Sequence, residues 1–204
     1  MFGRRTQTAS HGSARPVSIA KRTPKGKISI IGTGGGGEPS TIMLIQFITT
    51  GGTIDKIYHD AKSDYEVGDP QVIGLLQEAH ATFEYELVSL FRKDSLDLTE
   101  ADRSEIVAAA EDTKAGRIVI MHGTDTMVET AERLRGISGK VIVLTGSLAP
   151  ARFKASDAEF NLGMAVAAVQ CLDPGVYIAM NGHVFTAGSV IKNRTENRFE
   201  RVGP

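Results

Sequence analysis

Two short motifs of threonine, glycine and aspartate supply the side chains of this sequence that could do chemistry. Residues 49–54 (TTGGTI) follow the apolar run 42–48, and residues 122–126 (HGTDT) follow the apolar run 117–121. A threonine hydroxyl is a poor nucleophile unless a base or a charged partner activates it. The two threonine motifs bring a carboxylate, and also glycines that let the backbone approach a carbonyl substrate closely. The combination predicts an enzyme.

Each of these residues also has a structural interpretation that the residue types leave open. Thr53 could cap the turn that Gly51 and Gly52 form, and Thr124 and Asp125 could cap a following helix. Lys192 lies beyond the last expected strand, where it could fold back over the same edge. An exposed lysine is the favoured interpretation of that residue taken alone.

Other polar residues give weaker signals. We expect His122, at the end of a strand, to be a packed and hydrogen-bonded histidine rather than a base. Asp94 and Asp97 could be paired carboxylates, but a polar loop between strand and helix explains them equally well, and Ser95 is then a turn residue. The histidines show no metal-ligand spacing, and no phosphate-binding loop occurs. We therefore expect no metal and no cofactor.

The elements that must position these residues alternate between strand and helix. Apolar runs predict strands at residues 42–49, 83–91, 117–121, 141–145 and 176–180, and capping signals predict helices at 71–80, 99–114, 126–134 and 156–170. Asn181-Gly182 is a strong hairpin signal that returns the chain after the last strand. The pattern predicts an α/β fold, namely a doubly wound, mostly parallel sheet of about five strands with helices on both faces and a C-terminal β-hairpin. Ligands bind such sheets outside the carboxyl ends of the strands, where both threonine motifs lie.

The composition, with 41% hydrophobic and 23% charged residues in 204, is that of a globular protein. Residues 43–204 contain 16 basic and 23 acidic side chains, a net charge of −7, which argues against nucleic acid as a partner. No apolar stretch reaches the ~20 residues that a membrane span needs, and we expect a cytoplasmic protein. The single Cys171 lies in an apolar run, which predicts a buried, inert thiol.

The first 42 residues differ from the rest. They contain seven Lys and Arg against one acidic residue, and we expect a disordered basic extension ahead of a single domain at residues 43–204. A flexible tail, a transit peptide and a misassigned start are the alternatives, and Met43 at the head of the first strand favours the last. The glycine run 32–37 imitates a dinucleotide-binding loop, but Pro39 and a strand follow it instead of a helix, which favours a linker.

Taken in order, five segments resemble the L-asparaginase family over about residues 43–200. They are residues 50–54 (TGGTI), 63–68 (SDYEVG), 122–130 (HGTDTMVET), 160–162 (FNL) and 190–193 (VIKN). The resemblance implies that Thr53 is the nucleophile and that Tyr65 polarises its hydroxyl from a closing loop. It also implies a second cluster, made of Thr124, Asp125 and Lys192, that activates a nucleophile or water.

The resemblance further implies how the substrate is held. Ser95 matches the serine that binds the α-carboxylate, Asp125 holds the α-amino group, and Gly52 and Gly123 border the substrate. The implied reaction is hydrolysis of L-asparagine to L-aspartate and ammonia through an acyl-enzyme, with backbone N–H groups near Thr124 stabilising the oxyanion. A glutaminase, an amidotransferase-type amidase and a non-catalytic amino-acid-binding module are the alternatives.

Two departures from the family pattern affect binding. Typical members continue into a second domain that lends an acidic residue to the neighbouring subunit's substrate, and we expect this short form to lack that donor. Leu96 stands where high-affinity members carry a polar residue, so weaker binding is expected. Because the cleft needs cover from water, we expect a homodimer or homotetramer with Arg152, Lys192 or Arg194 near the subunit boundary.

Overall fold

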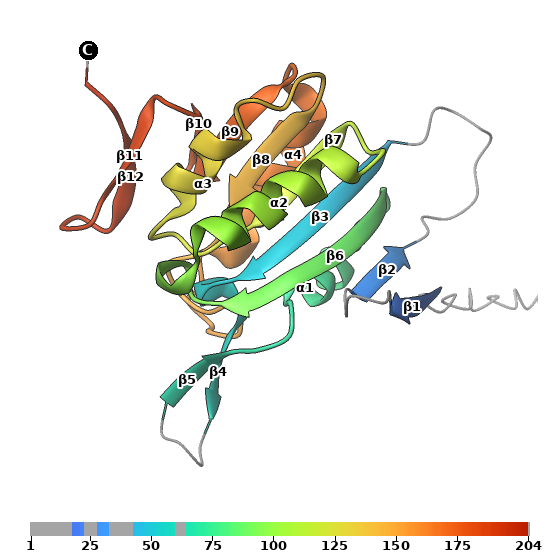
Figure 1. The fold of residues 1–204 in the computed structure, drawn as a ribbon. Coiled ribbons are helices and arrows are strands. Elements are labelled where there is room, and N and C mark those ends of the chain that lie inside the picture. The colour runs from blue at the N-terminus through green and yellow to red at the C-terminus, as the bar shows by residue number, and fades with distance from the viewer. Residues whose placement is uncertain (1–17, 23–27, 33–42, 60–63, 204) are drawn as a thin grey trace, which may run out of the picture.

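A central sheet of eight strands organises the molecule. The computed structural model describes residues 18–22, 28–32, 43–59 and 64–203, and the sheet has the order β1-β2-β6-β3-β7-β8-β9-β10 (Figure 1). Its five consecutive parallel strands are β6 (Glu84–Lys93), β3 (Leu44–Gly51), β7 (Arg117–Met121), β8 (Val141–Thr145) and β9 (Gly175–Met180). The expected mostly parallel α/β sheet is thereby confirmed.

The middle strands form because their apolar runs are covered on both faces. Every residue of β8 is buried, as are the last four residues of β7 and the last seven of β3. A strand buried on both faces reads as a continuous apolar run rather than an alternating one. The side chains therefore hold the sheet between two helical layers.

Four helices make up those layers. They are α1 (Val72–Glu78), α2 (Glu100–Asp112), α3 (Met127–Leu134) and α4 (Ala158–Cys171). Apolar residues of α1 and α4 pack in one core cluster and those of α2 and α3 in another, on opposite faces of the sheet (Figure 1). The doubly wound arrangement is confirmed.

The two edges of the sheet are antiparallel. At one edge β10 (His183–Thr186) pairs with β9 through the Asn181-Gly182 turn, where both residues have positive φ, as the hairpin signal predicts. At the other edge β1 (Ser18–Arg22) pairs with β2 (Ile28–Gly32), which pairs with β6.

These two strands lie inside the segment for which the sequence predicts disorder. Ten residues of that segment are strand in the structure, because the exposed edge of β6 offers unpaired backbone groups to them. The rest of residues 1–42, including most of the glycine run, lies outside the described residues. The division of the chain at residue 42 stays a prediction.

Two further hairpins lie outside the main sheet. One pairs β4 (Lys56–His59) with β5 (Asp64–Val67) and projects beyond the carboxyl ends of β3 and β6 (Figure 1). The other pairs β11 (Val190–Asn193) with β12 (Arg198–Arg201), and it packs its buried Val190 and Phe199 into the α2–α3 core cluster. Each hairpin carries one residue of the candidate site.

The prediction of a buried thiol is wrong. Cys171 is the last residue of α4 and is exposed. Ala165, Ala168 and Val169 turn the apolar stripe of the helix towards the sheet, and the 3.6-residue helical repeat leaves Cys171 on the solvent side of that stripe. An apolar run with no clear periodicity does not reveal which face of a helix is buried.

Candidate active site

Three loops at the carboxyl edge of the sheet form the floor of the site. They follow β6, β3 and β7, which are adjacent parallel strands and therefore end side by side. Parallel strands with helical crossovers collect their loops in this way at one edge. Residues far apart in the sequence are thus brought together by the topology alone.

Glycines allow these loops to touch backbone to backbone. Gly52 has a φ of 97°, and a Cβ placed on it would lie 2.5 Å from the Cα of Gly123. A Cβ on Gly123 would lie 2.7 Å from the Oγ of Ser95. Any larger residue at Gly52 or Gly123 would force the loops apart. The structure therefore brings Ser95, Gly52 and Gly123 into one stack.

Lys192, in β11, reaches across this edge to the loop after β7. Its Nζ donates hydrogen bonds to the Oγ1 of Thr124 and to the Oδ1 of Asp125, each at 2.7 Å. The Lys192 side chain is only 9% exposed, so the position that the residue type alone favours, an exposed lysine, is wrong. Thr124 and Asp125 bond to this ammonium rather than capping α3.

Thr53 begins a short 3₁₀ helix, Thr53–Asp55, that follows the glycine pair. It is partly buried, which leaves its hydroxyl within reach of a small ligand. Thr50, three residues earlier, is buried, and its Oγ1 donates to the carbonyl of Met121 at 3.1 Å. Thr50 therefore fixes β3 to β7, while Thr53 stays available for chemistry.

Tyr65, in β5, is not joined to Thr53. The residue is 44% exposed, and its ring packs edge-on against Tyr58 and Phe153, with centroid separations of 5.3 and 6.0 Å. The structure records no hydrogen bond between the Tyr65 hydroxyl and Thr53, both of which it describes. The expected polarising contact requires the hairpin to move.

Ser95 is 1% exposed, and its Oγ has no hydrogen-bond partner among the residues that the structure describes. An unpaired buried hydroxyl costs about 1–3 kcal/mol, so the group is suited to a ligand that completes it. The loop itself is fixed by Thr126, whose Oγ1 donates to the Ser95 carbonyl at 2.8 Å. Because the Oγ is shielded, a ligand can reach it only after a small shift of this loop.

His122 is a packed histidine, as the sequence predicts. It is fully buried, with Nδ1 2.7 Å from the Gly123 carbonyl and Nε2 2.9 Å from the Oγ1 of Thr130. Burial lowers the pKa of His122 to about 4, so the ring is neutral near pH 7. Its ring orients the backbone of the loop that carries Thr124.

The carboxylates after β6 do not form an acid pair. Asp94 pairs with Lys56 of β4 at 2.8 Å and accepts the Leu96 N–H at 3.2 Å. Burial alone would raise the pKa of Asp94, but the hydrogen bonds from Lys56 and Leu96 together lower it. Asp94 therefore connects the β4–β5 hairpin to the loop that holds Ser95.

Two residues whose importance the sequence did not reveal support the neighbouring loops. Asp55 is buried beside Thr53, and its Oδ1 accepts the Gln71 N–H at 2.9 Å. Asn161, which lies in one of the resembling segments, donates from Nδ2 to the Gly146 carbonyl at 3.1 Å and to Asp157 at 2.8 Å. In the sequence, the signal that could have pointed to Asp55 is a carboxylate directly after the apolar Ile54.

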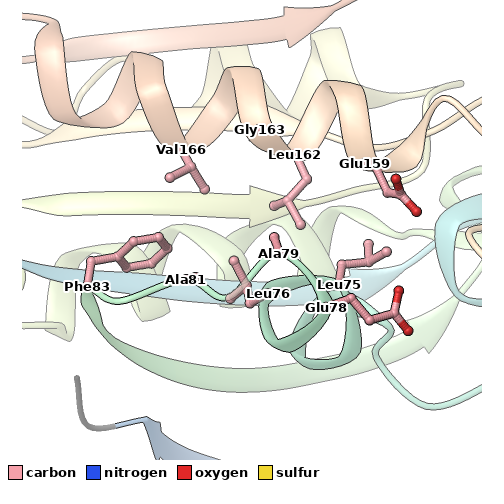
Figure 2. A pocket seen from close by; sticks show the side chains of 10 residues that line it. All are labelled: Leu75, Leu76, Glu78, Ala79, Ala81, Phe83, Glu159, Leu162, Gly163 and Val166. Carbon is pink, nitrogen blue, oxygen red and sulfur yellow. The ribbon is translucent and has the colours of Figure 1, made fainter. Parts of the chain in front are cut away.

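An apolar groove of about 490 Å³ lies apart from these residues, between α1 and α4 (Figure 2). Leucines and Phe83 line it, and two glutamates, Glu78 and Glu159, lie at one end (Figure 2). None of the site residues predicted from the sequence lines it. A lining of this kind offers few partners to a small polar amide, so the chemistry belongs to the strand ends.

In the described ranges, no group of three or more His, Cys, Asp or Glu residues could hold a metal ion. The helices in those ranges include none that is long and apolar enough to cross a bilayer.

Comparison with known proteins gives consistent matches. The family model for the N-terminal part of asparaginase matches residues 44–200. A glutaminase-asparaginase of Acinetobacter glutaminasificans is 41% identical over 80 residues, which cover 37% of this chain and 24% of that protein. A component of the glutamyl-tRNA(Gln) amidotransferase of Methanococcus vannielii is 28% identical over 180 residues, which cover 87% of this chain and 39% of that protein.

Among solved structures, a probable cytoplasmic L-asparaginase of Campylobacter jejuni superposes with a TM-score of 0.68 at 26% identity, covering 77% of this chain and 53% of that one. The chain thus matches about half the length of this structure and less than half of the two curated relatives.

Proposed function

The chain belongs to the asparaginase family, and from that premise we propose that it hydrolyses the side-chain amide of L-asparagine to L-aspartate and ammonia. One observation carries the proposal. A nearly buried ammonium, that of Lys192, contacts a threonine hydroxyl and a carboxylate, each at 2.7 Å, beside the glycine-lined edge that carries Thr53.

Lys192 acts electrostatically in this proposal. A charge shielded from water interacts strongly with its neighbours, and the ammonium is already aimed at the Oγ1 of Thr124. It stabilises negative charge that develops on that oxygen or on a water molecule that Thr124 holds. Asp125 compensates the lysine charge and keeps Nζ in place.

Thr53 is the proposed nucleophile. Its Oγ1 attacks the amide carbon, and the carbonyl π electrons move to the oxygen, where backbone N–H groups near Thr124 stabilise them. When the carbonyl re-forms, the C–N bond breaks, and the nitrogen takes the proton that the Thr53 hydroxyl has lost and leaves as ammonia. Water then attacks the carbonyl carbon of the resulting ester, the bond from that carbon to Oγ1 breaks, and one proton of the water returns to Oγ1 as aspartate is released. Tyr65 polarises the Thr53 hydroxyl once the hairpin has closed.

The rest of the substrate is held by the floor of the site. Ser95 donates its unpaired Oγ–H to the α-carboxylate, and Asp125 accepts from the α-amino group. Gly52 and Gly123 border the substrate, and because neither presents a side chain the loops of the floor can pack against one another beneath it. The exposed Leu96 offers the amine no polar partner, so we expect a KM in the upper part of the usual range, towards about 1 mM.

Ammonia release by the purified full chain tests the proposal. We expect turnover of L-asparagine at millimolar concentration without added metal or cofactor, and turnover lowered by about two to three orders of magnitude in a Lys192→Met variant. A wild-type chain that releases no ammonia from any amide, while binding asparagine in a calorimeter, would support the non-catalytic binding module instead.

A glutamine-directed amidase is the second candidate. It is favoured by the relatives, since one is a glutaminase-asparaginase and another belongs to an amidotransferase. The ratio of kcat/KM for asparagine to that for glutamine decides between the two. A ratio near or below one would move the assignment to glutamine.

Assembly and location are part of the same proposal. We expect a homodimer or homotetramer that covers the cleft near Arg152 or Arg194, and sedimentation at micromolar concentration should show at least about twice the mass of one chain. A fully active monomer would contradict this. A cytoplasmic location is in keeping with the Campylobacter relative, and cell fractionation tests it.

A further inference from the structure

Asp55 connects the turn that carries Thr53 to the far end of the β4–β5 hairpin. Its carbonyl accepts the Gly68 N–H at 2.8 Å, and its Oδ1 accepts the Gln71 N–H at 2.9 Å. Gly68 directly follows β5, the strand that carries Tyr65. Asp55, two residues after Thr53, is therefore bonded to Gly68, three residues after Tyr65.

The same turn is fixed on its other side. The Ile54 carbonyl accepts the Ala151 N–H at 3.1 Å, from the loop between β8 and α4. Arg152 in that loop donates from Nε to the side chain of Gln71 at 3.0 Å. The chain on either side of the hairpin is thus hydrogen-bonded to the loop between β8 and α4, through Ile54 and Gln71. The tyrosines of the hairpin itself are exposed.

Few charges surround the Asp55 carboxyl, which is 2% exposed. Arg92 faces it from β6 and Asp69 faces it from the segment before α1, and those two form an ion pair with each other. Burial raises the pKa of Asp55 to about 6, against the lowering effects of the Gln71 N–H and Arg92. Ionisation of Asp55 therefore lowers the stability of the fold, and a buried carboxyl with a perturbed pKa next to the turn of Thr53 is a candidate for a functional role.

We propose that Asp55 is a positioning residue for Tyr65. Its carbonyl holds Gly68 at the end of β5, and its carboxylate holds Gln71 at the far end of the segment that leads from β5 to α1. The carboxylate thereby fixes the strand of Tyr65 relative to the turn of Thr53, so that the tyrosine closes over the nucleophile in one register. The inference rests on the proposed function for its kinetic consequence but not for its structural one. Asp55 itself touches neither substrate nor reacting atoms.

A second contact at the hairpin base provides a matched control. Asp69, a carboxylate that follows Gly68, pairs with Arg92, and both of these side chains are more than half exposed. Exposed ion pairs contribute little, so the Asp69→Asn variant should keep kcat within about twofold of the wild type.

Kinetics of Asp55→Ala, Asp55→Asn, Tyr65→Phe and the Asp55→Ala/Tyr65→Phe double variant test the proposal on asparagine. We expect Asp55→Ala to lower kcat at least about tenfold with KM changed less than about threefold. Asp55→Asn should recover most of kcat, because its Oδ1 can accept the same N–H. In the Tyr65→Phe background, Asp55→Ala should cost less than about threefold, since both act through one hydroxyl. Additive losses, or an inactive Asp55→Asn, would overturn the proposal.

Hydrogen exchange tests the structural part without any substrate. In Asp55→Ala the amides of residues 64–68 should exchange at least about tenfold faster, while those of β7 and β8 keep their wild-type rates. Asp55→Asn should resemble the wild type. Unchanged exchange in residues 64–68 would refute the positioning role even if asparagine is hydrolysed, and faster exchange in a chain without hydrolysis would leave only the proposed function refuted.

Discussion

The two hairpins that deliver site residues hold them in opposite ways. β11 presents Lys192 through two 2.7 Å hydrogen bonds at a nearly buried position. β5 presents Tyr65 through ring contacts only, with 44% of the residue exposed. The contacts of Lys192 are already formed in this structure, whereas in the proposed mechanism the tyrosine half of the candidate site is completed only when the hairpin moves.

The difference follows from what each residue must do. A charged group stabilises a transition state most when it is already oriented and shielded from water, because the free energy needed to reorient it during the reaction would offset the stabilisation. A loop over the nucleophile must open for entry and exit, and ring contacts on the surface are weak enough to allow this. The comparison predicts that changes in the lysine half act on charge stabilisation and changes in the tyrosine half on closure.

Removal of either threonine should have the largest effect, because each half then loses its reacting oxygen. We expect Thr53→Ala and Thr124→Val to lower kcat by about three to four orders of magnitude. The unfolding midpoint should stay unchanged in Thr53→Ala, because this residue is only partly buried, and should fall in Thr124→Val, because the buried Oγ1 of Thr124 accepts from Lys192. Thr53→Ser, which keeps a hydroxyl, should retain measurable turnover. If Thr53→Ala keeps wild-type kcat, the nucleophile has been misassigned.

Lys192→Met should lower kcat by about two to three orders of magnitude, the effect of removing one well-oriented electrostatic group. The loss should appear in kcat more than in KM, because the ammonium acts mainly on developing charge. Lys154→Met provides a matched control at an exposed lysine and should be neutral. Equal losses in both variants would show that net charge, not position, is responsible.

Tyr65→Phe should lower kcat by about ten- to a hundredfold, less than Lys192→Met, because the hydroxyl only assists the nucleophile. Tyr58 is the matched control, since it pairs with Tyr65 across the hairpin and is also exposed. Tyr58→Phe should retain wild-type kinetics. A Tyr58→Phe variant as impaired as Tyr65→Phe would show that the loss is not specific to the Tyr65 hydroxyl.

Asp55→Asn should change the pH dependence of stability. The folded pKa of about 6 lies above the ordinary aspartate value of 3.8, so ionisation destabilises the fold as the pH rises through this window, by up to about 3 kcal/mol. The variant lacks this loss, and urea unfolding should show its gain in stability over the wild type growing between pH 4 and pH 6 and then levelling off.

His122 makes stability change with pH in the opposite direction, because its folded pKa of about 4 lies below 6.5 and protonation at low pH opposes folding. The variant should therefore gain stability steadily from pH 4 to pH 6.5, while the wild type changes less. An identical profile in the two proteins would contradict the buried carboxylate.

Cys171→Ser should have the smallest effect. The thiol is exposed at the end of α4, away from both halves of the site, so kcat should stay within about twofold of the wild type and stability within about 0.5 kcal/mol. A large loss of turnover would place a reactive thiol in the mechanism and contradict the threonine assignment.

The sequence predicted most of the fold because its strands are buried on both faces and are followed by glycine or polar loops. β7 and β8 begin and end where their apolar runs do. The helix predicted from residue 99 begins with a capping box, in which Thr99 accepts the Asp102 N–H and Asp102 accepts the Thr99 N–H. The start of α1, at Val72, also lies within one residue of the predicted start, and Asp69 ahead of it pairs with Arg92.

The site was predictable in part for a similar reason. Loops after adjacent parallel strands must meet, so the topology alone places Thr53 near Thr124. Residue types alone could not place Lys192, which is separated from Thr124 by 68 residues and lies outside the main sheet. Asp55 was missed because its importance comes from burial and from partners that lie 13 and 16 residues further along the chain.

Lys192 follows all five parallel strands in chain order, which has a consequence for synthesis on the ribosome. The last of those strands ends at Met180, so the ribosome makes all five before it makes the lysine. Until the lysine docks, Asp125 lacks its cation and Thr124 lacks the ammonium that contacts its hydroxyl. The hairpin that carries Lys192 also supplies Val190 and Phe199 to the α2–α3 core cluster, so the charge reaches its partners in the same step that completes this part of the core.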